Sequence, residues 1–238
     1  MHTRLVGRQA EVEALAAFLG AGSGTLLLDG PAGMGKTALW RSTIDLALAR
    51  GFCVLRARPT SSEAGLTLAT LADLLSGVPV GVLASLPARQ QEAIDVALLR
   101  SSGSRSTDPR ALGAAFLSIL ERLVEESRVL VALDDAQWVD ASSRSAISYA
   151  MRRIGQGVAL IATVPGEADA GMEPWLRSDD PESDRRVTVG PLGSGALHEL
   201  LLDRLGTPYP RPTMARIEEA SGGNPLHAIE LARYLGDA

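Results

Sequence analysis

Short apolar runs alternate along the chain with longer stretches in which apolar residues recur every three or four positions. The short runs have the length of strands, and the longer stretches have the period of helices. This alternation predicts an α/β fold with a mainly parallel sheet. Five strands are expected, at Thr25–Asp29, Phe52–Ala57, Val129–Leu133, Val158–Val164 and Arg186–Val189. Six helices are expected around them, at Gln9–Leu19, Thr37–Ala49, Leu66–Leu75, Ala88–Leu99, Pro109–Glu126 and Ser142–Ile154.

The strand pattern stops after residue 190, and the rest of the chain has a helical period. We therefore expect two parts, an α/β domain over residues 1–190 and a helical lid over residues 191–238. Two stretches rich in small, polar, Gly or Pro residues are predicted to be surface loops, at Ser101–Thr107 and Pro165–Asp184. The lid helices are expected at Ser194–Leu205, Thr213–Ala220 and Pro225–Leu235.

Composition narrows the class of protein. With 46% hydrophobic and 21% charged residues the chain is typical of a globular protein. Its net charge of −5 argues against a nucleic-acid surface, which needs clustered Lys and Arg. The apolar runs are shorter than the roughly 18 residues that span a bilayer, and the first residues lack an apolar signal core. We expect a cytoplasmic protein without a membrane span, in which the single cysteine, Cys53, is a buried thiol.

Residues 30–37 read Gly-Pro-Ala-Gly-Met-Gly-Lys-Thr, which matches the P-loop pattern, directly after an expected strand and directly before an expected helix. Glycines allow the loop to wrap a phosphate with its N–H groups pointing inward, and the helix adds its positive end. Lys36 is the only lysine in the chain, and its thin ammonium stem fits such a loop better than a guanidinium. The pattern predicts a purine nucleotide site, with ATP preferred. Its predicted contacts are Gly30, Pro31, Ala32, Gly33, Met34, Gly35, Lys36, Thr37 and Ala38.

A second motif follows the strand Val129–Leu133, which ends in Asp134 and Asp135. A buried parallel strand delivers such residues to the edge of the sheet where ligands bind. The Thr37 hydroxyl is predicted to ligate Mg²⁺ and Asp134 to hold it through water, while Asp135 is predicted to polarise an attacking water. Thr163 ends the next strand and is expected to sense the γ-phosphate, although a half-buried threonine is common in any strand. The predicted catalytic residues are Lys36, Asp135 and Thr163.

Two other classes of phosphate-binding protein do not fit the sequence. GTPases read guanine with an Asn/Thr-Lys-x-Asp motif, and a chain whose single lysine lies in the P-loop does not contain it. The stretch Ala220–Asn224 is similar to the ABC transporter signature, but that signature precedes the acidic strand end, whereas this stretch follows it.

With these motifs in place, the chain resembles the STAND class of AAA-like ATPases, and within it the large ATP-binding regulators of the LuxR type. The resemblance rests on Leu5–Arg8, Gly30–Thr37, Leu133–Asp140 and Ser221–Leu226. It implies that Val6 and Arg8 lie on one side of the adenine and that Pro225 covers its other face. From the residues alone, Pro225 equally fits the first position of the last helix.

The chain departs from that family in two respects. Val164 stands where the family commonly has an arginine that touches the γ-phosphate. Arg152 or Arg153 is a candidate substitute for that charge, and both equally fit solvated positions of a helix. Regulators of this family are much longer, with helical repeats and a DNA-binding helix-turn-helix, and these 238 residues have no room for either. We therefore expect an ATPase domain whose partners are the nucleotide and the remainder of a larger regulator. Its last two helices lack a basic face, and no direct DNA contact is expected.

These features together lead to the hypothesis of a regulatory switch that binds Mg-ATP or ADP and hydrolyses ATP slowly. One alternative is a scaffold that holds ADP permanently. Another is a P-loop kinase for a small molecule, with Arg177–Arg186 as its arginine-rich closing segment. AAA-like domains often assemble when ATP is bound, which leaves nucleotide-dependent self-association open.

Overall fold

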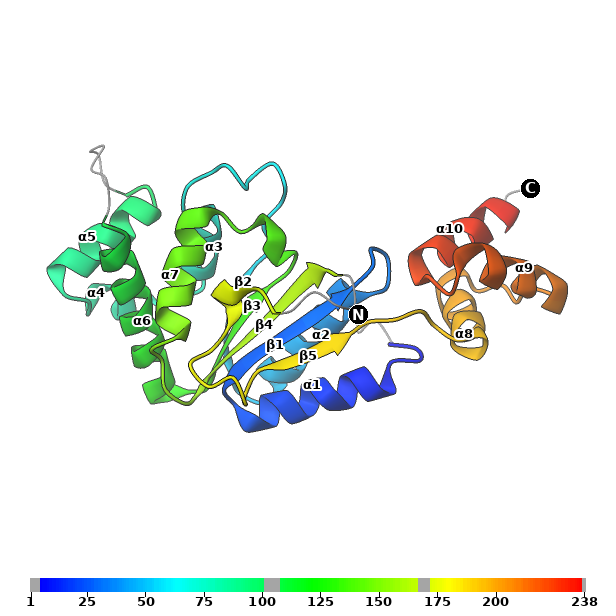
Figure 1. The fold of residues 1–238 in the computed structure, drawn as a ribbon, viewed down its shortest axis with the longest axis horizontal. Helices are drawn as coiled ribbons and strands as arrows, with labels where there is room; N and C mark the ends of the chain where they lie inside the picture. Colours follow the sequence, from blue (N-terminus) through cyan, green and yellow to red (C-terminus); the bar gives the residue numbers. More distant parts are fainter. Residues whose placement is uncertain (1–4, 101–107, 167–171, 237–238) are drawn as a thin grey trace.

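The computed structural model describes residues 5–100, 108–166 and 172–236. Its centre is a five-stranded sheet in the order β2-β3-β4-β1-β5, and every pair of neighbouring strands is parallel (Figure 1). The strands are β1 Gly24–Gly30, β2 Cys53–Ala57, β3 Val129–Leu133, β4 Val158–Pro165 and β5 Arg185–Thr188. The predicted α/β fold with a parallel five-stranded sheet is thus confirmed, and all five strands lie within two residues of their predicted bounds.

Alternate residues of the strands face opposite layers of helices, because successive side chains in a strand point to opposite sides. Leu26 and Leu28 pack against α1 (Gln9–Ala21) and α2 (Lys36–Ala49). Leu27 faces the other layer. That layer consists of α3 Ala69–Leu75, α4 Val80–Ala84, α5 Ala88–Ala97, α6 Pro109–Glu126 and α7 Ala141–Met151. The central strands are therefore buried on both faces, which explains their continuous apolar runs.

Some helix bounds differ from the prediction for local reasons. The helix expected from Leu66 begins only at Ala69, because Leu68 adopts a left-handed backbone conformation with φ 66°. The short helix α4, between Pro79 and Pro87, was not predicted, since five residues carry too little periodicity to be recognised. The stretch expected as a loop from Pro165 contains the short 3₁₀ helix η2 (Pro174–Leu176). The other expected loop, Ser101–Thr107, lies outside the described residues.

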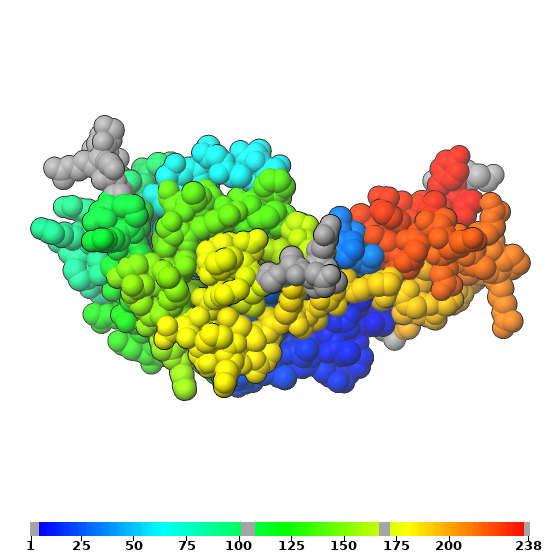
Figure 2. Space-filling view, viewed as in Figure 1, coloured from blue at the N-terminus to red at the C-terminus, as the bar shows by residue number. Residues whose placement is uncertain are grey.

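The C-terminal helices form a lobe beside the sheet (Figure 2). They are α8 Ser194–Leu205, α9 Arg211–Ser221 and α10 Pro225–Gly236, and they share a small core of their own. Val6, from the N-terminal segment, belongs to this core, and a side chain at Gly7 would meet Ala196 of α8. The N-terminal segment therefore packs on the helical lobe, while the division of domains at residue 190 stays a prediction. Within the described ranges, no helix combines the length and apolarity needed to cross a bilayer.

Candidate functional site

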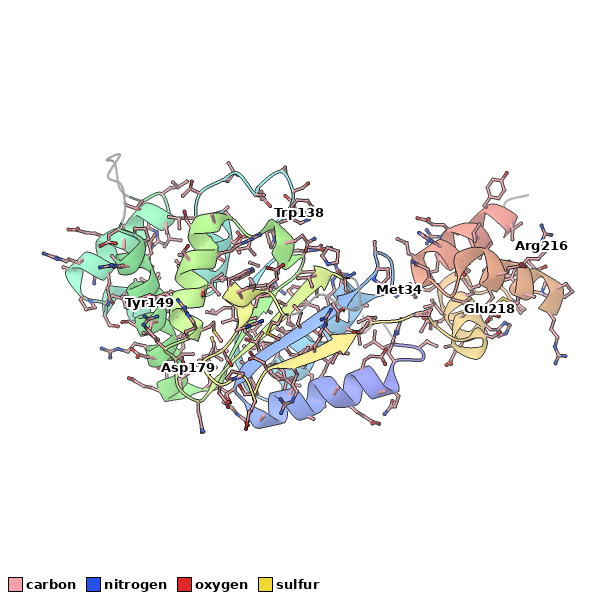
Figure 3. All side chains as sticks on the ribbon, viewed as in Figure 1. Met34, Trp138, Tyr149, Asp179, Arg216 and Glu218 are labelled. Atoms are coloured by element: carbon pink, nitrogen blue, oxygen red, sulfur yellow. The ribbon has the colours of Figure 1, made fainter. Side chains whose placement is uncertain are left out.

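The loop between β1 and α2 lies at the carboxyl edge of the sheet. Its glycines adopt backbone conformations that side chains disfavour, with φ of 142° at Gly30, 82° at Gly33 and 97° at Gly35. At Gly33 the lack of a side chain also has a steric reason, because a Cβ atom there would lie 2.5 Å from Oδ1 of Asn224. Figure 3 shows Met34 of this loop next to the helical lobe.

All five carbonyl groups of residues 30–34 accept hydrogen bonds from outside the loop. The donors come from four places: Lys36 at the start of α2, the N-terminal segment, the start of α10, and Gly166 after β4, whose N–H donates to Gly30 O over 3.3 Å. The bonds are Lys36 Nζ to Gly30 and Pro31 (2.7 and 2.9 Å), Asn224 Nδ2 to Ala32 (2.9 Å), Leu226 N to Gly33 (3.3 Å) and Arg8 Nη2 to Met34 (2.9 Å).

The backbone amides of the same loop are free. Within the described part of the chain, the N–H groups of residues 32–35 donate no hydrogen bond. Carbonyls that are held outward, with amides left unpaired, make a concavity suited to an anion, and the N-terminus of α2 adds its positive end. The loop is thus shaped for phosphate, as its sequence predicts.

Lys36 is 9% exposed and spans the base of the loop through its two carbonyl bonds. Burial lowers the pKa of its ammonium, and the nearby carboxylates of Asp135, Asp134 and Asp29 oppose this shift. A buried ammonium close to free amides is a strong site for a polyphosphate, because low dielectric strengthens the attraction.

Asp134 is fully buried at the end of β3, and two hydroxyls fix one of its oxygens. Thr163 donates to Oδ1 over 2.8 Å and Thr37 over 3.2 Å. The other oxygen, Oδ2, accepts no hydrogen bond from the described residues. Arg58, at the end of β2, lies near it as an ion pair, with Nε 3.1 Å from Oδ2 but without hydrogen-bond geometry. A carboxylate oxygen that accepts no hydrogen bond, next to a threonine hydroxyl, fits the oxygen ligands that Mg²⁺ prefers.

Asp135 follows with a left-handed backbone conformation, φ 55° and ψ 51°. Non-glycine residues rarely adopt this conformation, and the strain persists only where the surroundings hold it. Here the backbone N–H of Asp135 donates to the Thr163 hydroxyl over 2.7 Å. The side-chain amide of Gln137 donates to Oδ1 of Asp135 over 3.2 Å. Thr163 therefore positions both acidic residues, a role that the sequence did not predict. Its contact with nucleotide stays a prediction.

Asp140 closes the same segment and has a structural role. Its carboxylate accepts hydrogen bonds from the backbone amides of Ser143, Leu68 and Thr70, and so caps both α7 and α3. Burial alone would raise the pKa of Asp140, but the bonds from Ser143, Leu68 and Thr70 outweigh it and lower the pKa. Through Asp140 the acidic strand end is tied to the helix that follows β2.

The three residues expected around the adenine lie where the sheet meets the helical lobe. Arg8 is 6% exposed, and its guanidinium also donates to Gly190 O over 2.7 Å and to Glu11 over 2.8 Å. Val6 belongs to the lobe's core, and Pro225 begins α10 half-buried. The structure shows Arg8 bridging the P-loop and the segment that leads to α8. Base contacts by Arg8, Val6 and Pro225 stay predictions.

The suggested substitutes for the missing sensing arginine are in the wrong place. Arg152 and Arg153 follow α7 and precede β4, so they lie at the opposite edge of the sheet, roughly 20 Å from the P-loop at about 3.3 Å per strand residue. Arg153 stacks on Tyr149, which Figure 3 shows remote from Met34. Val164 itself packs against the hydrophobic core. The arginine that lies next to Asp134 at the carboxyl edge is Arg58, which sequence analysis missed because no motif marks it.

In the segment Arg177–Arg186, which the kinase alternative uses as its closing segment, Arg186 is committed to the sheet. Arg186 lies on β5, where Nη2 donates to Oδ2 of the buried Asp29 over 2.8 Å. Thr188 donates to the other oxygen of Asp29 over 3.0 Å. These bonds hold β5 against the end of β1, directly before the P-loop, so the segment serves the sheet.

The sheet order, the phosphate-shaped loop and the acidic strand end define a P-loop nucleoside triphosphatase fold. The comparison with known families agrees: residues 4–164, more than half of the chain, match the AAA ATPase domain family. The chain therefore belongs to this family of nucleotide-binding ATPases.

Individual relatives are more distant. An uncharacterized protein of Rhizobium meliloti (strain 1021) is 25% identical across 90% of this chain, which spans 23% of that protein's length. Among solved structures, a Walker-type ATPase of Pyrococcus abyssi is similar at a TM-score of 0.55 and 15% identity, covering 96% of this chain and 68% of that one. DnaA from Aquifex aeolicus, solved with AMPPCP bound, is similar at 0.53 and 15%, covering 96% and 60%. These structures share the fold.

Proposed function

We propose that this domain binds Mg-ATP and ADP at the P-loop and acts as a slowly hydrolysing, nucleotide-dependent switch. The observation that carries the proposal is the orientation of the loop's peptide groups. The five carbonyls of residues 30–34 are all committed to hydrogen bonds while the amides of residues 32–35 stay free, and two of these carbonyls are held by the start of α10. A phosphate bound by the amides is therefore coupled directly to the position of the helical lobe, which we call the lid.

The residues at the end of β3 supply the chemistry of hydrolysis. Thr37 and Asp134 are the residues that would hold Mg²⁺, which neutralises phosphate charge when bound. In this proposal Asp135 polarises and orients a water, and the Thr163 hydroxyl holds the carboxylate of Asp134 and the backbone N–H of Asp135. Lys36 contributes a positive charge at the base of the loop.

The lid and the N-terminal segment supply the switch. Asn224 and Leu226 hold Ala32 and Gly33, and Arg8 joins Met34 to Gly190 in the segment between β5 and α8. A nucleotide that reorients the loop favours one of two lid positions by its differential affinity for them. Slow turnover suits such a device, since each state must last long enough to be read.

The ADP-held scaffold remains the second candidate function. It is favoured by Val164, which leaves the end of β4 without the family's sensing arginine. The kinase alternative has no support from Arg186, because that residue serves β5.

The larger context of the proposal is a LuxR-type regulator of the STAND class, in the cytoplasm. It rests on the sequence resemblance and agrees with the small share, 23%, that the chain covers of its Rhizobium relative. In this proposal the rest of the regulator reads the lid and binds DNA, while this acidic domain makes no DNA contact of its own. ATP-dependent self-association belongs to the same proposal.

The proposal is tested by measuring bound nucleotide, phosphate release and lid exchange on the same preparations. Wild type is expected to bind ATP and ADP, Lys36→Ala neither, and Asp135→Asn to bind both with slower phosphate release. Hydrogen exchange at the start of α10 should differ between the ATP-bound and ADP-bound wild type. Unchanged ATP affinity in Lys36→Ala would refute the site, and identical exchange in both nucleotide states would refute the switch. Bound ADP that does not exchange would support the scaffold.

A further inference from the structure

Arg58 is placed to distinguish ATP from ADP. We propose that its guanidinium pairs with Asp134 in the nucleotide-free domain and moves to the terminal phosphate when Mg²⁺ and ATP are bound. The inference rests on the proposed function and assigns the residue that supplies the charge missing at Val164.

The sheet fixes the position of Arg58. Strands β2 and β3 pair in parallel, with Ala57 opposite Leu133, so the residues that follow, Arg58 and Asp134, leave the sheet side by side. A backbone hydrogen bond from Asp134 N to Ala57 O, 3.1 Å long, continues this pairing one step beyond the strands. Arg58 is thus held next to the Mg²⁺-binding aspartate by backbone geometry, independent of its own side chain.

The contact between the two side chains is one that can be exchanged. Nε of Arg58 lies 3.1 Å from Oδ2 of Asp134, yet the Arg58 side chain is 54% exposed while that of Asp134 is fully buried. Apart from this ion pair, Arg58 makes no hydrogen bond to the described residues. The exposed guanidinium can leave when Mg²⁺ takes its place, because the buried carboxylate then keeps a cation as its partner.

The two oxygens of Asp134 have different tasks. Oδ1 is committed to Thr37 and Thr163, which leaves Oδ2 as the oxygen that a hydrated Mg²⁺ can use. Arg58 and the metal therefore compete for the same oxygen. A guanidinium displaced from Oδ2 can bind phosphate well, because its planar set of N–H donors matches the spacing of phosphate oxygens.

Two other arginines near the site, Arg8 and Arg186, already have partners. Arg8 bonds three groups of the framework, and Arg186 is paired with Asp29. Arg56 lies on β2, two residues before Arg58. Its side chain is exposed and forms no hydrogen bond or ion pair with the described residues. It offers a control with the same change of charge on the same strand.

The test measures equilibrium binding of Mg·ADP and of Mg-bound AMPPCP, a non-hydrolysable ATP analogue, to the intact domain. Arg58→Ala should weaken AMPPCP about tenfold, the order expected for one hydrogen bond to a charged group, while ADP affinity changes less than about twofold. Arg56→Ala should change neither. Arg58→Lys should recover part of the AMPPCP affinity. In a titration of Mg²⁺ against bound ADP, Arg58→Ala should need less Mg²⁺ than wild type, because no cation has to be displaced from Oδ2.

Circular dichroism and the melting temperature establish that each variant is folded, and Arg58→Gln replaces Arg58→Ala if the alanine variant is not. Equal loss of both nucleotides, or a retained preference for AMPPCP over ADP, would overturn the proposal. An unchanged Mg²⁺ requirement would overturn the competition at Asp134. If wild type binds neither nucleotide, the proposed function itself fails. If nucleotide binding depends on Lys36 but Arg58→Ala keeps the wild-type preference for AMPPCP over ADP, this inference alone is overturned and the proposed function stands.

Discussion

Thr163 donates a hydrogen bond of 2.8 Å from its hydroxyl to Oδ1 of Asp134, and both side chains are almost fully buried. The same hydroxyl accepts the backbone N–H of Asp135. One side chain at the end of β4 therefore sets the positions of both acidic residues at the end of β3.

Thr163→Val keeps the volume of the side chain and removes both hydrogen bonds. It leaves the partly buried N–H of Asp135 unpaired and removes a donor from the buried carboxylate of Asp134, so we expect the free energy of unfolding to fall by about 2 kcal/mol in urea denaturation. Nucleotide affinity should fall more with Mg²⁺ than without it, because Asp134 loses its orientation. Thr163→Ser, which keeps the hydroxyl, is the control and should resemble wild type. Equal stability of the valine and serine variants would contradict this role.

Gly33→Ala should detach the lid from the P-loop, since its Cβ would lie 2.5 Å from Oδ1 of Asn224. That oxygen caps α10 by accepting from Leu226 N and His227 N. We expect faster hydrogen exchange at these two amides. Gly35→Ala is the matched control, because it carries similar backbone strain but meets nothing within 4 Å. Equally fast exchange in both variants would show that strain in the loop, not the contact with Asn224, is the cause.

Asp140→Ala should destabilise the domain by about 2 kcal/mol, because one carboxylate caps two helices. The pKa of Asp140 is lowered in the folded protein, so its contribution is present above the ordinary value of 3.8 and is lost as pH falls through the folded value. The difference from wild type in urea denaturation should therefore shrink in acid. Asp108→Ala, which removes an exposed cap of α6 alone, should cost less. A difference that is constant with pH would contradict the assignment.

Nucleotide affinity should fall at a lower pH than it would if Lys36 had the pKa of an ordinary lysine. Burial lowers its pKa from 10.5, so the ammonium that attracts phosphate is lost as pH rises through that lower value. Titration calorimetry with ADP in the absence of Mg²⁺ should show proton uptake on binding in this range. Thr37→Ala retains the lysine and should keep the same profile. An affinity that stays constant up to pH 10.5 would contradict the prediction.

Much of the fold could be predicted from the sequence, because the central strands and the P-loop carry strong local signals. The strands β1, β3 and β4 contain continuous apolar runs, and the residues of Gly30–Thr37 follow the pattern of a phosphate-binding loop. The short helix α4 could not be predicted, because five residues carry too little periodicity. The late start of α3 could not be predicted either, because it depends on Asp140, 72 residues away from Leu68.

The contacts between distant segments carry no signal in a single sequence. Arg58 is an arginine after a strand like many others, and only the pairing of β2 with β3 brings it to Asp134. In the same way, Asn224 reads as a helix cap, and its bond to Ala32 appears only when the lid is folded against the loop. Spatial neighbours of this kind define much of the candidate site.

The outward-held carbonyls of the P-loop also set a limit on any regulation of this domain. The carbonyl of Ala32 and the amide of Gly33 belong to one rigid peptide plane, as do those of Gly33 and Met34. Tilting an amide toward a phosphate therefore tilts the carbonyl that α10 holds. Thermodynamic reciprocity then requires that any protein segment that pulls α10 from the loop changes nucleotide affinity by the same factor by which nucleotide changes the affinity for that segment.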